Sequence, residues 1–198
     1  MSAPTFDRRQ LGALRELATL GCGAAVRALG QLTRLGLEMD VPETWVGAEA
    51  GAIAAFLGAL GSDLVCTGVK LEGPLTGHLL LALPEPDAEV MAMALGAPAQ
   101  AGTFGPLAES AMMESGNIVG SAFVSAVARR VRETLLLSVP TFARGSGRAC
   151  VEKLVDHAGS VALATRFTSP AAPRLEGLIL VMPEPSSIRR LLDHLDQG

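Results

Sequence analysis

Three polar side chains follow one another at helical spacing in the second half of the chain. Ser110, Glu114 and Asn117 stand at positions i, i+4 and i+7, which places them on one narrow stripe of a helix. A carboxylate can form a charge-assisted bond with a lysine ammonium group, and a carboxamide both donates and accepts hydrogen bonds. Such a stripe could dock a cation and hold a water molecule. A glutamate and an asparagine alone are a common pattern, more often an ordinary solvated helix face.

Small residues surround this stripe, among them Gly116, Gly120 and Ser121. Glycine inside a helix costs about 1 kcal/mol relative to alanine, so the pattern predicts that another backbone or a partner surface comes very close. We interpret this side of the helix as an exposed docking ridge with little side-chain bulk.

The chain repeats itself with a period of about 98 residues. Glu16 and Glu114 are 98 positions apart, and so are Pro42 and Pro140. Residues 79–86 also resemble residues 178–185, at an offset of 99. This period is too long for a solenoid and predicts one domain over residues 1–198, made of a duplicated unit. The two repeats are expected at about 5–96 and 104–197, joined by a Gly/Ala/Pro-rich linker at 96–105.

Each repeat reads as a long helix followed by strands and a closing helix. The pattern predicts an α/β (α+β) fold with pseudo-two-fold symmetry, in which helices pack on an antiparallel-rich sheet. An additional helix at 48–60 has no clear counterpart in the second repeat, where Ser146-Gly147 suggests a turn. The expected long helices are 8–35 and 107–132, and the expected strands are 41–46, 64–71, 77–83, 135–142, 160–167 and 175–182.

Composition narrows the classes of function. The chain has 198 residues, 49% of them hydrophobic, and a net charge of -4, which indicates a globular protein and argues against nucleic acid as a partner. The three cysteines are far apart and form no CxxC pair, and the three histidines lack metal-ligand spacing. The apolar stretch 50–62 is too short for membrane insertion. We therefore expect a cytoplasmic protein. The arginines at 129, 130 and 132 lie at the end of the second long helix, where positive charge interacts favourably with the helix dipole.

The spaced residues together resemble a family signature. The pattern Ser110-x3-Glu114-x2-Asn117-x22-Pro140 resembles that of the CheC, CheX and FliY chemotaxis phosphatases. The run 114–120 is similar to the family's Glu-x-Gly-Asn-Ile helix, and the duplicated layout is most similar to CheC. The resemblance implies hydrolysis of the aspartyl phosphate on a CheY-type response regulator.

The resemblance also implies roles for individual residues. Asn117 would position the attacking water, Glu114 would dock to the lysine of the receiver domain, and Ser110, Pro140 and Glu16 would support docking. The chain itself would need no cofactor and no metal, because the response regulator would supply Mg²⁺. On the residues alone, Pro140 more simply sets strand geometry, and Ser110 more simply supports the entry into its helix.

The first long helix departs from the signature. Thr19 stands where asparagine is expected, and Gly12 stands where serine or aspartate is expected. A threonine hydroxyl reaches less far than a carboxamide, so we predict that this first site is weak or inactive, with Glu16 still able to help docking. The alternative function is a non-catalytic adaptor that binds a response regulator or the CheD deamidase. An orphan relative acting on a receiver outside chemotaxis is a third possibility.

Overall fold

The computed structural model describes residues 6–46, 49–98, 104–156, 161–170 and 175–196. The same order of elements occurs twice along this part of the chain: a helix, two strands, a helix, two strands and a helix. The first series is α1 (Arg8–Thr33), β1 (Glu38–Met39), β2 (Glu43–Val46), α2 (Ala50–Gly58), β3 (Leu64–Glu72), β4 (Gly77–Pro84) and α3 (Glu85–Ala94). The second is α4 (Pro106–Val131), β5 (Leu136–Leu137), β6 (Thr141–Gly145), α5 (Gly147–Leu154), β7 (Val161–Ser169), β8 (Leu175–Pro183) and α6 (Pro185–Asp196).

The sheet is antiparallel throughout its described strands. Its order is β1-β7-β8-β4-β3-β5, with β2 also pairing with β7 and β6 also pairing with β3. The order is unchanged when each strand is exchanged for its equivalent in the other series. At the centre, Leu80 faces Leu180 and Leu81 faces Ile179, two pairs that the same exchange interconverts.

The predicted fold class is therefore confirmed, and this arrangement supports the duplicated unit. The division into two repeats stays a prediction, and residues 99–103 of the expected linker lie outside the described residues. No described helix is both long and apolar enough to cross a bilayer.

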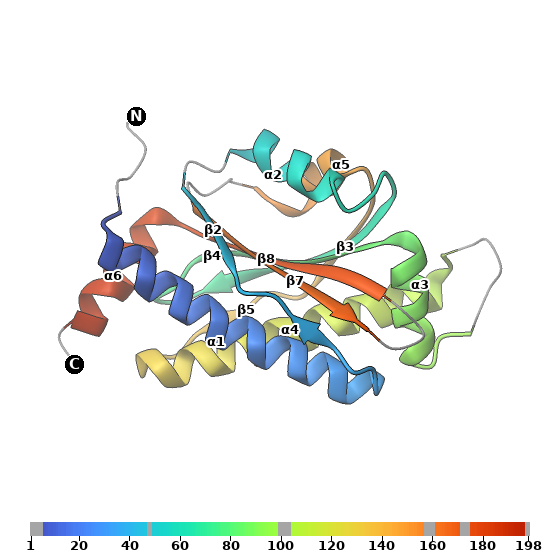
Figure 1. The fold of residues 1–198 in the computed structure, drawn as a ribbon, viewed down its shortest axis with the longest axis horizontal. Coiled ribbons are helices and arrows are strands. Elements are labelled where there is room, and N and C mark those ends of the chain that lie inside the picture. The colour runs from blue at the N-terminus through green and yellow to red at the C-terminus, as the bar shows by residue number, and fades with distance from the viewer. Residues whose placement is uncertain (1–5, 47–48, 99–103, 157–160, 171–174, 197–198) are drawn as a thin grey trace.

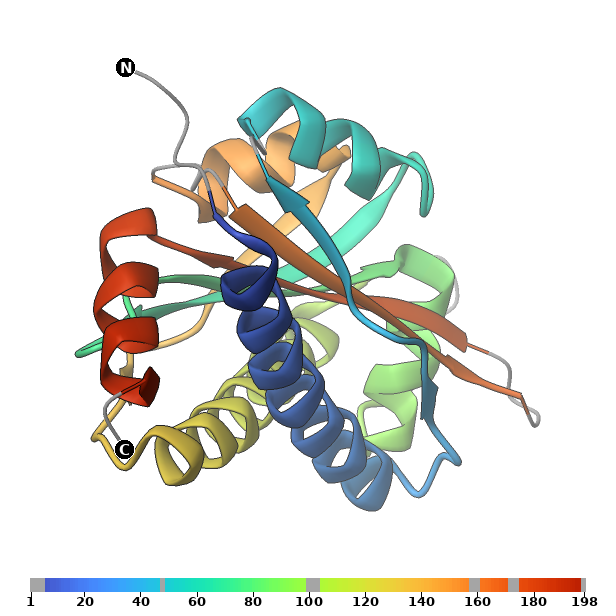
Figure 2. The ribbon, with the colours of Figure 1, turned by 60° about the vertical axis from the view of Figure 1, so that its left-hand side comes forward.

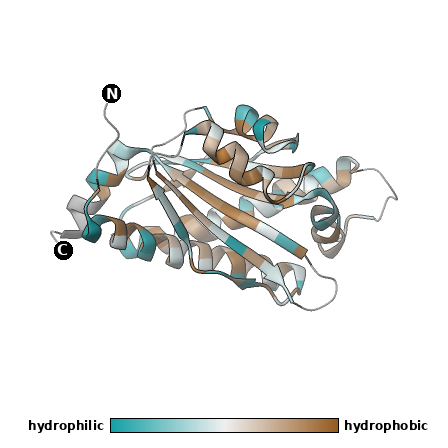
Figure 3. Cartoon of the chain, turned by 45° about the horizontal axis from the view of Figure 1, so that its top comes forward, coloured by the Kyte–Doolittle hydropathy of each residue, from teal (hydrophilic) through white to brown (hydrophobic). Residues whose placement is uncertain are grey.

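The sheet lies between two helical layers, with α1 and α4 on one face and α2 and α5 on the other (Figure 1). Side chains along a strand alternate between the faces, so Leu79, Leu81 and Leu83 join the core under α1 and α4. Leu80 and Ala82 join the smaller core under α2 and α5. Because both faces are covered, the central strands read as continuous hydrophobic runs, which appear brown in Figure 3.

The two long helices form one antiparallel pair under the sheet (Figure 2). Asp7 caps α1 in a capping box, in which its Oδ1 accepts from the Gln10 amide at 2.8 Å, while Pro106 opens α4 with a preset φ. Both helices end at an arginine with left-handed backbone, Arg34 at φ 58° and Arg132 at φ 56°. The pair places the N-terminal half of each helix beside the end of the other.

The helix α5 corrects the expected turn at Ser146-Gly147. The Ser146 hydroxyl caps this helix by accepting from the Ala149 amide at 3.3 Å. Gly147 is buried against α2, where an added Cβ would lie 2.5 Å from the Ala54 carbonyl oxygen. The prediction was wrong because a serine and a glycine that begin a short, tightly packed helix look like turn residues in sequence.

Candidate functional site

A groove of about 960 Å³ runs beside α4. It is lined by the outer face of α4, the loop between β5 and β6, the end of α3 and Leu32 at the end of α1. Ser110, Glu114, Asn117 and Pro140 all line this groove. The structure thus brings together the four positions of the second-repeat signature, although Pro140 is more than twenty residues from the helical stripe.

The helical stripe faces away from the core. Ser110, Glu114 and Asn117 are exposed, and Ser115 and Gly116 lie buried between them. The Ser115 hydroxyl is turned inward and donates to the Ala111 carbonyl at 3.0 Å. The carboxylate and the carboxamide therefore stand one helical turn apart on the solvent side of α4.

The glycines of α4 face the sheet and not the groove. An added Cβ on Gly116 would lie 2.4 Å from Thr67 Oγ1 on β3, and one on Gly120 would lie 3.0 Å from the Val69 side chain. The expected close approach exists, but it is an internal approach of α4 to β3. The interpretation of these glycines as part of a low-bulk docking ridge was therefore wrong.

The loop that carries Pro140 is anchored to the edge of β3. The Lys70 amide donates to Ser138 Oγ at 2.9 Å, and the Ser138 amide donates to the Lys70 carbonyl at 3.0 Å. This pair of bonds holds the next two residues beside the stripe. Pro140 is half-buried in the groove wall, whereas Val139 is 80% exposed at the loop's tip.

Glu114 is the only charged residue among the described residues that line the groove. Within the described part of the chain, neither its carboxylate nor the Asn117 carboxamide has a hydrogen-bond or ion-pair partner. Three exposed hydrophobic side chains, Leu32, Leu107 and Val139, stand around them. The unpaired Glu114 carboxylate can therefore bind a cationic side chain of a partner protein whose surface covers these three hydrophobic side chains, the apolar rim of the groove.

The corresponding face of α1 differs in both polar positions. The Glu16 carboxylate forms an ion pair with Arg130 at 3.3 Å, and the Thr19 hydroxyl donates to the Arg15 carbonyl at 2.8 Å. Both side chains are exposed, but each is already engaged within the molecule. Glu16 is therefore not part of the α4 groove.

The hydrophobic rim was not predicted from the sequence. Its signal was present in the repeat, because Val41-Pro42 and Val139-Pro140 are the same dipeptide one period apart. The two valines are among the most exposed large hydrophobic residues of the described chain, at 75% and 80%. As for metals, the described residues hold no cluster of three or more histidine, cysteine, aspartate or glutamate side chains that could bind an ion.

Comparison with known proteins gives relatives in sequence and in structure. A scan against known protein families finds no match. The chain is 28% identical over 153 residues to CheC1 of Halobacterium salinarum, named as a CheY-P phosphatase, covering 76% of this chain and 77% of that protein. It is also 28% identical over 139 residues to the CheY-P phosphatase CheC of Bacillus subtilis, covering 68% and 66%.

Solved structures of chemotaxis proteins share the fold of this chain. FliY of Thermotoga maritima superposes with a TM-score of 0.71 over 98% of this chain and 99% of that one, at 12% identity. CheX in the CheX–CheY–BeF₃–Mg²⁺ complex of Borrelia burgdorferi gives 0.59 over 86% and 99%, at 17% identity. The chain thus resembles the CheC proteins in sequence and shares the fold of FliY and CheX.

The shared fold alone does not decide what a protein does. The middle domain of FliM from H. pylori also shares it, with a TM-score of 0.65 over 96% of this chain and 99% of that one, at 15% identity. The function of this chain must therefore be argued from its groove.

Proposed function

We propose that this chain is a phosphatase that hydrolyses the aspartyl phosphate of a CheY-type response regulator at the α4 groove. One observation carries the proposal: an unpaired carboxylate and an unpaired carboxamide lie one helical turn apart on an exposed helix face, with no other charge in the described groove lining. The names of the two CheC relatives support the same substrate.

Glu114 serves as the docking carboxylate. The receiver's lysine would meet it directly, because no cation of this chain lines the described groove. A carboxylate–ammonium bond is charge-assisted and strong, and it becomes stronger when the partner's surface displaces water from the hydrophobic rim. This bond would set α4 over the phosphorylated aspartate.

Asn117 serves to position water. Hydrolysis of an acyl phosphate needs a water molecule in line with the phosphorus, and positioning supplies much of the acceleration. The carboxamide oxygen of Asn117 can accept a hydrogen bond from the water, and its NH₂ group can donate one, so the side chain holds the water without acting as a base. Mg²⁺ belongs to the response regulator in this proposal, and its charge would stabilise the negative charge of the phosphoryl group.

Ser110 and Pro140 have supporting roles. Ser110 stands one turn before Glu114 in the groove and offers a neutral hydroxyl to the docking partner. Pro140 keeps the anchored β5–β6 loop rigid, because its ring fixes φ. That loop presents Val139 as the apolar tip of the groove.

We further propose that the molecule is one domain of two repeats, at about 5–96 and 104–197, working in the cytoplasm. Of the two equivalent faces, only that of α4 carries both a glutamate and an asparagine. On the α1 face the shorter Thr19 side chain stands in place of the asparagine, and its hydroxyl donates to the Arg15 carbonyl, so this face would be weak or inactive in hydrolysis.

The direct test follows loss of phosphate from a phosphorylated CheY-type receiver of the same organism, in the presence of Mg²⁺. Wild-type protein should accelerate the decay well above the receiver's own rate, and the double variant E114A/N117A should not. A decay that wild-type protein leaves unchanged contradicts the proposal.

The second candidate is an adaptor that binds a response regulator or the CheD deamidase without hydrolysis. The loss of the asparagine from one of the two equivalent faces, where Thr19 stands, favours this candidate, because it leaves room for a role other than hydrolysis. Tight binding of an activated receiver without any acceleration of its decay would establish the adaptor role in place of the phosphatase.

A further inference from the structure

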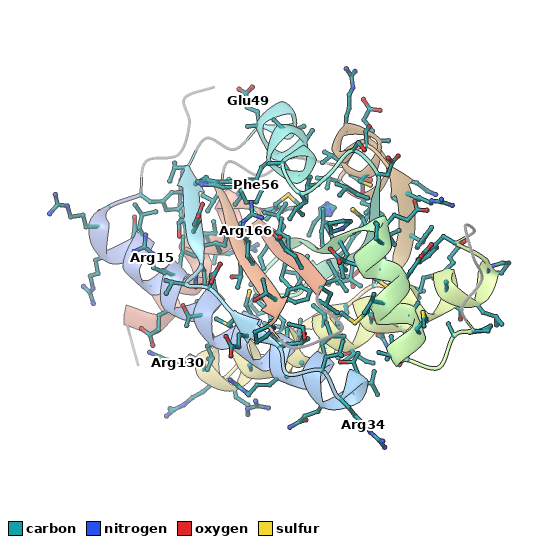
Figure 4. The ribbon with its side chains drawn as sticks, turned by 45° about the vertical axis from the view of Figure 1, so that its right-hand side comes forward. Arg15, Arg34, Glu49, Phe56, Arg130 and Arg166 are labelled. Atoms are coloured by element: carbon teal, nitrogen blue, oxygen red, sulfur yellow. The ribbon has the colours of Figure 1, made fainter. Side chains whose placement is uncertain are left out.

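The two equivalent glutamates, Glu16 and Glu114, have different neighbours at the ends of α4 and α1. Each glutamate lies beside the last turn of the other long helix, at equivalent positions of the antiparallel pair. Arg130 of α4 stands beside Glu16 and pairs with it at 3.3 Å. The position that corresponds to Arg130 in α1 is Leu32, which lines the groove with Glu114. Figure 4 shows Arg15 and Arg130 at one end of the helix pair and Arg34 at the opposite end.

We propose that this arginine–leucine difference decides which of the two faces accepts a receiver. This inference rests on the proposed function, because it assumes that a receiver lysine docks on a glutamate of the exposed stripe. Arg130 occupies the Glu16 carboxylate and places a positive charge where the lysine would have to approach. Leu32 leaves the Glu114 carboxylate free and adds apolar surface to its rim.

Apart from Arg130 and the missing asparagine, the α1 face keeps the features of a docking surface. Glu16 remains exposed, and Val41 stands 75% exposed at the position equivalent to Val139. The loss of asparagine removes the group that would hold water, but it does not by itself prevent docking. Arg130 thus acts through Glu16 and disfavours docking of a receiver on the α1 face, which lacks the asparagine for hydrolysis.

The strength of this exclusion is moderate. The Glu16 and Arg130 side chains are 65% and 48% exposed, and exposed ion pairs contribute little because water and salt screen them. Arg130 competes with the receiver's lysine for the Glu16 carboxylate and also repels that lysine, and both effects weaken docking on the α1 face. We expect a difference in affinity of about three- to tenfold at low salt.

The test moves the arginine to the other face. The variant L32R places a guanidinium beside Glu114, and Q31R is the matched control, because Gln31 is an exposed neighbour on the same last turn that does not line the groove. The probe is a CheY-type receiver of the same organism, activated with beryllofluoride and Mg²⁺, and the readout is its dissociation constant.

L32R should bind this receiver about three- to tenfold more weakly than wild type at 50 mM salt, and the difference should shrink at 500 mM salt. Q31R should stay within about twofold of wild type. Equal weakening by Q31R, or a loss in L32R that salt does not reduce, overturns the inference. An unchanged affinity of L32R overturns it as well.

The reverse exchange uses the background E114A, in which the α4 face has lost its docking carboxylate. Adding R130L should recover about three- to fivefold in affinity, and adding E16A to that variant should abolish the gain. Equal affinities of E114A and E114A/R130L contradict the proposal.

The inference and the proposed function fail separately. A salt-dependent L32R effect without accelerated phosphate loss by wild type keeps the docking rule and removes the phosphatase. Accelerated phosphate loss with no L32R effect keeps the phosphatase and removes the docking rule. No measurable binding of the activated receiver to wild type overturns both.

Discussion

Glu114 and Asn117, one helical turn apart on α4, have different tasks in the proposed mechanism. Glu114 offers charge, so Glu114→Gln keeps the shape of the side chain and removes its attraction for an ammonium group. We expect a five- to fiftyfold weaker affinity for an activated receiver, and a rate at saturating receiver that falls much less. Phosphate release against receiver concentration checks this, with Glu109→Gln, an exposed glutamate outside the described groove lining, as the control.

Ser110 is proposed to assist docking without taking part in the hydrolysis. Its hydroxyl lies one turn from Glu114, and its removal leaves both the charge and the carboxamide in place. Ser110→Ala should change the rate and the affinity by no more than about fivefold. A loss as large as that of the Glu114 variant, measured in the same assay, would make Ser110 part of the chemistry and contradict its supporting role.

At the scale of elements, the position of the stripe depends on how closely α4 approaches β3. An added methyl group on Gly116 would lie 2.4 Å from Thr67 Oγ1, so Gly116→Ala must push the helix away from the sheet. We expect a loss of about 1–3 kcal/mol in the free energy of unfolding, with reduced activity because the stripe moves.

The matched control lies on the other long helix. Gly12 is exposed inside α1, and an added Cβ there meets nothing within 4 Å. Gly12→Ala should therefore stabilise the protein by up to about 1 kcal/mol. Urea denaturation of both variants measures the two effects, and equal stabilities would contradict the internal role of Gly116.

For the whole molecule, periodicity in the sequence was enough to predict a duplicated unit of helices packed on an antiparallel sheet. The two long helices and the four central strands lie where the sequence predicted them, because each repeat carries strong hydrophobic patterns. The eight-residue α5 was missed because packing against α2, which no local pattern records, holds Gly147. The direction of Gly116 and the partner of Glu16 were also hidden, since both depend on contacts distant in sequence.

The buried Cys22 thiol makes the free energy of unfolding depend on pH in the alkaline range. Burial raises the pKa of the Cys22 thiol to about 11 from 9.0, so the folded state holds this proton more tightly than the unfolded chain does. Its contribution is complete below pH 9 and is lost as the pH rises toward 11, by roughly 3 kcal/mol. Cys22→Ala should unfold with a shallower pH dependence across this window, and identical slopes would contradict the assignment.

In the proposed mechanism Asn117 acts on the water and not on docking, so measuring both affinity and rate for Asn117→Ala separates the two roles. Asn117→Ala should bind a beryllofluoride-activated receiver within about threefold of wild type, because Glu114 and the hydrophobic rim remain. Its acceleration of phosphate loss at saturating receiver should fall about a hundredfold, since the water is no longer placed. Wild-type acceleration by Asn117→Ala, at unchanged affinity, would contradict the account.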